Sequence, residues 1–85
     1  MNYLIAVFRS RNQTTTMFHL CSRNGINCAI VNTPREAYVG CGISLKFQEG
    51  DLPKVKALLR QFGASSFAGL FRVSVRGKKS YVSRI

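Results

Sequence analysis

Two segments with helical periodicity, each set between strand-like segments, constrain the fold of this chain more than any other feature. The first strand-like segment is apolar at nearly every position, as in a strand buried on both faces. Ser10 then provides a helix N-cap, and the helices that follow carry apolar stripes at helical spacing. The predicted order is β-α-β-β-α-β, over residues 2–9, 11–23, 26–31, 43–47, 51–62 and 67–75.

This order predicts an α+β domain of the ferredoxin-like split βαβ type, with two helices on one face of a four-stranded antiparallel sheet. Right-handed crossovers place the first and third strands side by side at its centre. Residues 1–85 form one domain, and residues from about 76 to 85 are a basic C-terminal extension that either returns as a short strand or stays loose. The other sheet face would lie open, and a second copy of the chain, giving a homodimer, is a candidate to cover it.

The charge of the chain indicates an anionic partner. Thirteen Lys and Arg residues against three Asp and Glu give a net charge of +10, which favours nucleic acid or another acidic surface. The alternative explanation for the high net charge is that the proteins of the host organism are basic in general. The candidate anion-binding side chains are Arg72, Arg76, Lys78 and Lys79.

The apolar runs are too short for a membrane span, which needs ~20 residues, and the N-terminal segment reads as a strand rather than a signal peptide. Three cysteines, an odd count, suit free thiols in a reducing cytoplasm. Cys21 and Cys28 are predicted packing residues of the core, and His19 is predicted to face solvent. With no CxxC pair, one histidine and three acids, we expect no metal site and no cofactor.

Cys41 differs from the other cysteines because it lies in a loop between Gly40 and Gly42. The predicted topology brings this loop to the end of the domain where the first helix begins, so Cys41 should lie near Ser10 and Arg11. A helix N-terminus favours thiolate over thiol.

Arginines and glycines add to this prediction. Arg35 in the same loop would add positive charge, and the flanking glycines would allow close approach to the sulfur. We therefore expect an exposed thiol of lowered pKa at Cys41. The alternative is that the glycines shape a tight turn and Cys41 only fills it.

Three short motifs make the chain similar to a known family. "NGI" before the second strand, "TPR" at residues 33–35 and "CGISLKF" from Cys41 onward resemble the small selenium/sulfur carrier protein-like domains, over about residues 3–71. The resemblance implies that Cys41 holds sulfur or selenium, that Gly42 adjoins it, and that Pro34 and Arg35 shape the loop. It also implies donor and acceptor proteins as partners and a relay rather than a turnover enzyme. The basic tail, residues 72–85, departs from the family.

Two other functions stay open at this point. A four-stranded βαββαβ sheet with high positive charge is also typical of RNA-binding modules. Such a module needs exposed aromatic side chains on its central strands, and only Tyr3 is a ready candidate, while Arg72 and Arg76 could contact phosphates. The remaining hypothesis is a regulatory or assembly domain that dimerises through the open sheet face.

Overall fold

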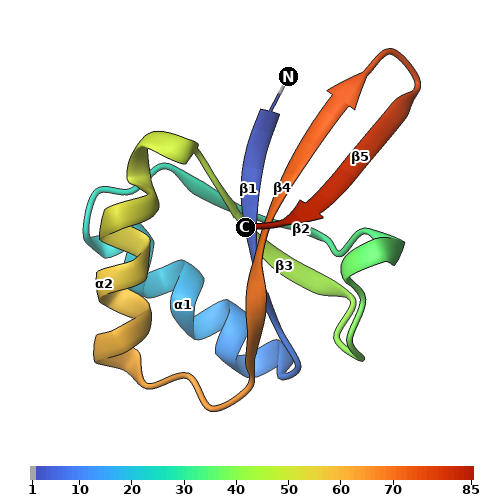
Figure 1. Ribbon diagram of the computed structural model, residues 1–85. Helices are drawn as coiled ribbons and strands as arrows, with labels where there is room; N and C mark the ends of the chain where they lie inside the picture. The colour runs from blue at the N-terminus through green and yellow to red at the C-terminus, as the bar shows by residue number, and fades with distance from the viewer. Residues whose placement is uncertain (1) are drawn as a thin grey trace.

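The computed structural model describes residues 2–85 and confirms the α+β class (Figure 1). The predicted order of elements is also confirmed, with one further strand at the end. Short 3₁₀ turns η1 and η2 precede β3 and α2. The elements are β1 (Asn2–Phe8), α1 (Arg11–Arg23), β2 (Cys28–Asn32), η1 (Arg35–Ala37), β3 (Ile43–Phe47), η2 (Glu49–Asp51), α2 (Leu52–Phe62), β4 (Phe67–Arg76) and β5 (Lys79–Arg84).

α1 begins and ends at the predicted residues, whereas α2 begins at Leu52, one residue later than predicted, and ends where predicted. The Ser10 side chain accepts a hydrogen bond from Gln13 N at 3.3 Å and so caps α1. Pro53 lies in the first turn of α2, and Gly63 ends that helix in the left-handed conformation, with φ of 64°. Within residues 2–85, neither helix combines the length and apolar content that crossing a bilayer requires.

The sheet has five antiparallel strands in the order β2-β3-β1-β4-β5. β1 lies between β3 and β4, so the predicted pairing of the first and third strands is confirmed. Residues 79–84 turn back and pair along β4 as a fifth strand, so the predicted sheet of four strands is extended and the alternative of a returning C-terminal strand is confirmed. A two-residue turn, with Gly77 at φ of 61°, makes that reversal possible. The basic C-terminal segment is therefore part of the sheet.

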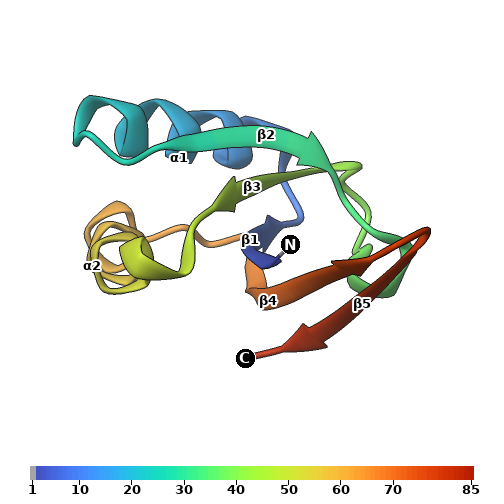
Figure 2. The same ribbon diagram turned by 90° about the horizontal axis from the view of Figure 1, so that it is seen from above.

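One face of the sheet packs against both helices (Figure 2). Alternate residues of β1 point into this helix-side core, where they meet the apolar stripes of α1 and α2. Its buried members are Leu4, Ala6, Phe8, Met17, Cys21, Ile26, Leu45, Phe47, Val55, Leu58 and Leu70.

The opposite face is also covered, so the expectation of an open face is wrong. Ile5 and Val7 of β1 are 0% exposed, and they cluster with Ala37 of η1 and with Phe71 and Val73 of β4. We call these five residues the far-face core. Figure 2 shows the η1 turn on the side of the sheet away from the helices. The chain itself supplies the cover that the apolar pattern of β1 demands, which removes the argument for a dimer through this face.

Replacing Ile5 by alanine should test that cover. Because Ile5 is fully buried, Ile5→Ala should lower the free energy of unfolding by about 2–4 kcal/mol. Ile30→Ala, at a side chain that is 38% exposed, is the control and should cost well under half as much. Urea unfolding at several protein concentrations measures both. A midpoint that rises with protein concentration would contradict the conclusion that the chain covers this face by itself.

Candidate functional site

The loop that carries Cys41 is closed at its base by Thr33. Thr33 N donates to Gly42 O at 2.9 Å, and Thr33 Oγ1 donates to Cys41 O at 3.2 Å. The same hydroxyl lies 2.6 Å from Ser44 Oγ, which can donate to it. We call these three contacts the Thr33 clasp. They tie the end of β2 to the start of β3, so that residues 33–42 form a closed loop.

Within the loop, the η1 turn lies over the sheet. Pro34 precedes η1 in an extended conformation, with φ of −59° and ψ of 150°, and Tyr38 N donates to Arg35 O at 3.2 Å. Ala37 is 2% exposed and packs into the far-face core. Pro34 and Arg35 therefore take part in shaping the loop through their backbone, whereas the Arg35 side chain is exposed to solvent.

Cys41 is buried, so the prediction of an exposed thiol is wrong. The residue is 5% exposed, and its Sγ lies 3.6 Å from the Ile43 carbonyl oxygen, to which it can donate.

The glycines on either side of Cys41 are themselves exposed. Gly40 has φ of 113°, a conformation that favours glycine. A Cβ added at Gly40 or Gly42 would meet no atom within 4 Å. The space beside the Cys41 backbone is therefore open, even though its sulfur points inward.

The predicted position of Ser10 and Arg11 beside Cys41 stays a prediction. Ser10 caps α1, and Ser10 N donates a hydrogen bond at 3.2 Å to Ser66 Oγ in the loop before β4. Among the described residues, no hydrogen bond or ion pair links Ser10 or Arg11 to Cys41. Pro34, Arg35, Gly40 and Gly42 share with Cys41 the loop that the Thr33 clasp closes.

The other cysteines occupy two different environments, and all three thiols are free. Cys21 is 0% exposed, as predicted. Burial raises the pKa of its thiol to about 11, with smaller contributions from Cys28 and Asp51. Cys28 packs against the helix-side core, as predicted, but is only half-buried. It lies on the edge strand β2, where no further strand covers it.

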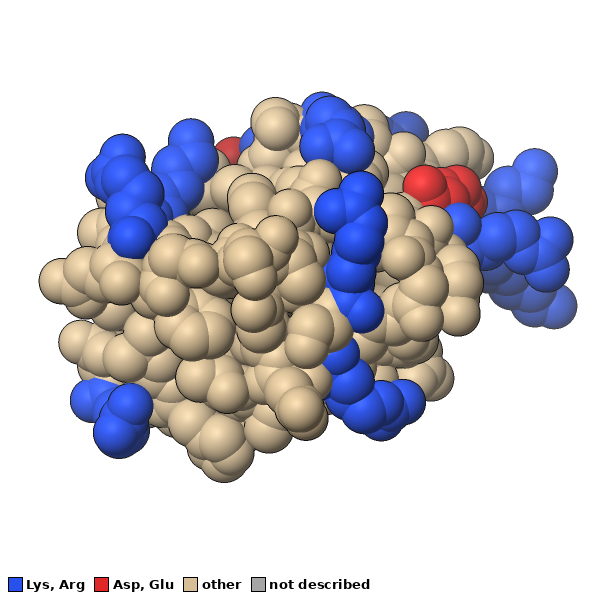
Figure 3. Space-filling model, turned by 90° about the horizontal axis from the view of Figure 1, so that it is seen from below, with Lys and Arg blue, Asp and Glu red and all other residues tan. Residues whose placement is uncertain are grey.

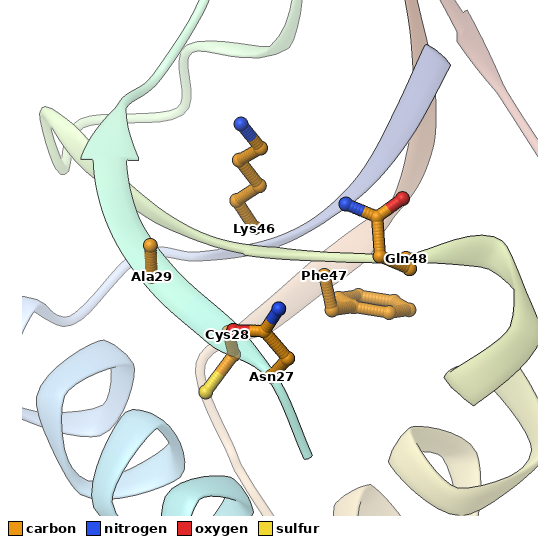
Figure 4. Close-up of a pocket in the computed structure, with 6 residues that line it drawn as sticks. All are labelled: Asn27, Cys28, Ala29, Lys46, Phe47 and Gln48. Atoms are coloured by element: carbon orange, nitrogen blue, oxygen red, sulfur yellow. The ribbon is translucent and has the colours of Figure 1, made fainter.

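A shallow hollow of about 170 Å³ lies beside Cys28, but its side chains do not converge on one point (Figure 4). The Cys28 sulfur points toward α1, 3.6 Å from Ser22 Oγ and 3.8 Å from Phe18 O. Lys46 extends from the opposite face of the sheet, since it pairs with Ala29 rather than Cys28. In residues 2–85, no group of three or more His, Cys, Asp or Glu could hold a metal ion.

The predicted anion-binding residues lie on the β4–β5 hairpin. Arg72 is already paired with Glu49 at 2.7 Å, and the Arg76 guanidinium lies 6.0 Å from the centre of the Tyr81 ring. Lys78 and Lys79 follow Gly77 in the turn and at the start of β5, and both are exposed. On the face that Figure 3 shows, Lys and Arg lie in several separate groups.

Residues 3–66 match the model of one protein family, described as Putative Se/S carrier protein-like. The matched region includes Pro34, Arg35, Cys41 and Gly42. It ends before β4, so the β4–β5 hairpin lies outside it. No curated protein and no solved structure matches the chain.

Thr33→Val should make the Cys41 thiol react faster while the fold is kept. The change removes the hydroxyl contacts of the Thr33 clasp and leaves its backbone hydrogen bond. A net hydrogen bond is worth ~1 kcal/mol, so opening of the loop should become about fivefold more frequent. The rate of reaction with DTNB, in a Cys28→Ser background so that Cys41 is reported, measures this opening.

The control is Thr15→Val, the same substitution at a helical threonine that bonds only to Arg11 O at 3.1 Å. This variant should leave the Cys41 rate unchanged. Equal rates in the Thr33 and Thr15 variants would show that the Thr33 hydroxyl does not hold the loop closed.

The raised pKa of the Cys21 thiol predicts that the folded chain loses stability at alkaline pH. The pKa of this thiol is raised from 9.0 to about 11 in the folded chain, so the unfolded chain loses this proton first as the pH rises. Stability linked to Cys21 is present below about pH 9 and declines as the pH approaches 11. Urea unfolding across this range should show a steeper decline for the natural chain than for Cys21→Ala. Parallel declines would contradict the assignment.

Proposed function

Since the chain belongs to the family described as Putative Se/S carrier protein-like, we propose that it carries a sulfur or selenium atom on Cys41. The scaffold is, in our interpretation, a ferredoxin-like arrangement extended by β5. The observation that supports the proposal most is the position of Cys41 inside the matched region, in a loop closed by the Thr33 clasp. The partners are a donor and an acceptor protein, and the chain acts as a relay rather than as a turnover enzyme.

The choice of Cys41 over the other cysteines has physical support. Cys21 lies in the helix-side core with its pKa raised to about 11, so its thiolate is scarce near neutral pH. Cys28 is more exposed, but its sulfur points toward α1 and contacts Ser22 and Phe18. Cys41 lies on a loop, between residues where added side chains would meet no atoms, and opening of that loop would expose its sulfur.

The transfer needs no oxidant or metal. The Cys41 thiolate attacks the outer sulfur of a donor persulfide, R–S–SH. A new sulfur–sulfur bond forms at Cys41, the donor's own S–S bond breaks, and its electron pair leaves with the donor as the thiolate R–S⁻. Cys41 then holds Cys–S–SH, with the proton on the outer sulfur. A thiolate of the acceptor protein attacks that outer sulfur and releases Cys41, and selenium would follow the same path from R–S–SeH.

Burial of Cys41 gives the carrier two states. In the closed state, the loop shields the sulfur from solvent, which would protect a reactive persulfide from oxidation or loss to small thiols. In the open state, a partner's thiol reaches it. Opening must separate η1 from the far-face core and break the side-chain part of the Thr33 clasp. The loop is therefore the element that a donor or acceptor would have to engage.

Intact-protein mass spectrometry tests the proposal. The chain is incubated with a cysteine desulfurase and cysteine, and the expected product is about 32 Da heavier, the mass of one added sulfur atom. Cys41→Ser should lose this adduct, whereas Cys28→Ser should keep it. Thr33→Val should gain it faster than the natural chain does.

Two results would overturn the proposal. One is the absence of any adduct on the natural chain when a thiol of known reactivity is loaded in the same mixture. The other is an adduct that persists in Cys41→Ser and disappears in Cys28→Ser, which would move the carrier role to the edge strand.

A further inference from the structure

One face of the β4–β5 hairpin carries a row of cations with an exposed aromatic ring among them. Residues directly opposite in an antiparallel pair point to the same face. The register pairs Arg76 with Lys79, Ser74 with Tyr81 and Arg72 with Ser83. These six side chains therefore share one side of the two strands, which we call the ribbon face.

The ribbon face is directed away from the apolar side of the hairpin. Val73, Val75 and Val82 point the other way, toward the far-face core. The described pairing of β1 with β4 ends at Asn2 and Ser74, so Arg76 and Lys79 lie beyond the central strand. Figure 1 shows the hairpin rising past β1 and away from both helices. A long ligand could therefore lie along the ribbon face without meeting the body of the domain.

The charges on the ribbon face repel one another. Arg76 and Lys79 are directly opposite across the strands, and like charges in that position destabilise a sheet. The segment 67–85 contains no Asp or Glu that could relieve the repulsion. Within residues 2–85, the one ion pair joins Arg72 to Glu49. A bound anion would compensate the charge at Arg76 and Lys79, and Lys78 in the turn adds to the local potential.

Tyr81 gives the ribbon face a flat surface beside these cations. Its side chain is 54% exposed, and the Arg76 guanidinium lies 6.0 Å from its ring centre. Exposed aromatic rings next to basic side chains are how proteins hold single-stranded nucleic acid, with a base stacked on the ring and phosphates on the cations. We propose that the ribbon face binds single-stranded nucleic acid, with a base on Tyr81 and phosphates at Arg76 and Lys79.

The structure argues against the more familiar position for RNA on a sheet of this kind. That position is the sheet face opposite the helices, and here η1 packs on it beside the side chains of β4, so that Ile5 and Val7 are 0% exposed. Tyr3 is the aromatic residue that the sequence predicted for base stacking. Its ring already contacts the Lys46 ammonium, which lies 4.4 Å from the ring centre. The hairpin therefore takes the place of the sheet face as the binding surface.

This activity is independent of the carrier role. The ribbon face lies wholly outside the region that matches the carrier family, residues 3–66, and contains no cysteine. Loss of sulfur transfer in Cys41→Ser should leave binding at the ribbon face unchanged, so the two proposals can fail separately.

Fluorescence anisotropy with a labelled oligouridylate of about twelve nucleotides tests the proposal, with the salt concentration varied. The double variant Arg76→Gln/Lys79→Gln should bind at least tenfold more weakly. Each phosphate contact to a single strand contributes ~0.7 to the slope of log K against log salt, so this slope should fall by about 1.4. Tyr81→Thr, which keeps strand propensity, should weaken binding roughly tenfold at an unchanged slope, because stacking releases no counterions.

The matched control removes the same charge elsewhere. Lys54→Gln/Lys56→Gln changes two exposed lysines of α2 and should alter affinity less than twofold, and Tyr81→Phe should bind like the natural chain. Circular dichroism melts confirm that each variant is folded. The proposal would be overturned by equal losses of affinity in the two double variants, or by no binding of the oligouridylate to the natural chain. It would also be overturned if a polyglutamate peptide of matched charge competed equally well, because that result would indicate an acidic protein partner.

Discussion

The rest of the structure depends on the burial of β1 on both of its faces. Leu4, Ile5, Ala6, Val7 and Phe8 are all 0% exposed, and each large apolar side chain contributes ~1.5–3 kcal/mol when fully buried. A central strand of this kind needs a cover on each side of the sheet. The two helices provide one cover, and the loop with η1, together with β4 and β5, provides the other.

The second cover couples stability to the accessibility of Cys41. The loop that holds Ala37 against the far-face core is the same loop that carries Cys41 between its glycines. When the loop is closed, Ile5 and Val7 are shielded and the sulfur is buried. Opening of the loop, which the carrier proposal requires, would separate Ala37 from Ile5 and Val7, so it would cost apolar burial as well as the contacts of Thr33. A partner that supplies apolar contacts to the loop would lower this cost.

The chain joins a family-related part to a hairpin that the family model does not reach. Residues 3–66 hold β1, both helices and the Cys41 loop, while β4 and β5 follow. The hairpin is nevertheless part of the sheet, because β4 pairs with β1 from Phe67 to Ser74 and supplies Phe71 and Val73 to the far-face core. Only its outer end, with Arg76, Lys79 and Tyr81, neither pairs with β1 nor supplies side chains to the far-face core.

The sequence by itself determined the local features. Ser10 and Gly63 set helix boundaries, the alternation of Ile43, Leu45 and Phe47 set β3, and the helical stripe placed Cys21 in the core. Such features depend on residues within a few positions of each other, so a single sequence contains the whole signal. The pairing of β1 with β3 also followed, because chain connectivity and crossover handedness leave few alternatives.

Only the tertiary structure decided what lies over the far face, and with it the state of Cys41. Residues 33–42 have no periodicity, so nothing local indicates that Ala37 packs on Ile5 and Val7 or that Thr33 closes the loop. The partial exposure of Cys28 likewise follows from β2 being an edge strand. Burial is decided by segments far apart in the chain that meet only in the fold, which is why the apolar pattern of β1 predicted a cover but could not identify it.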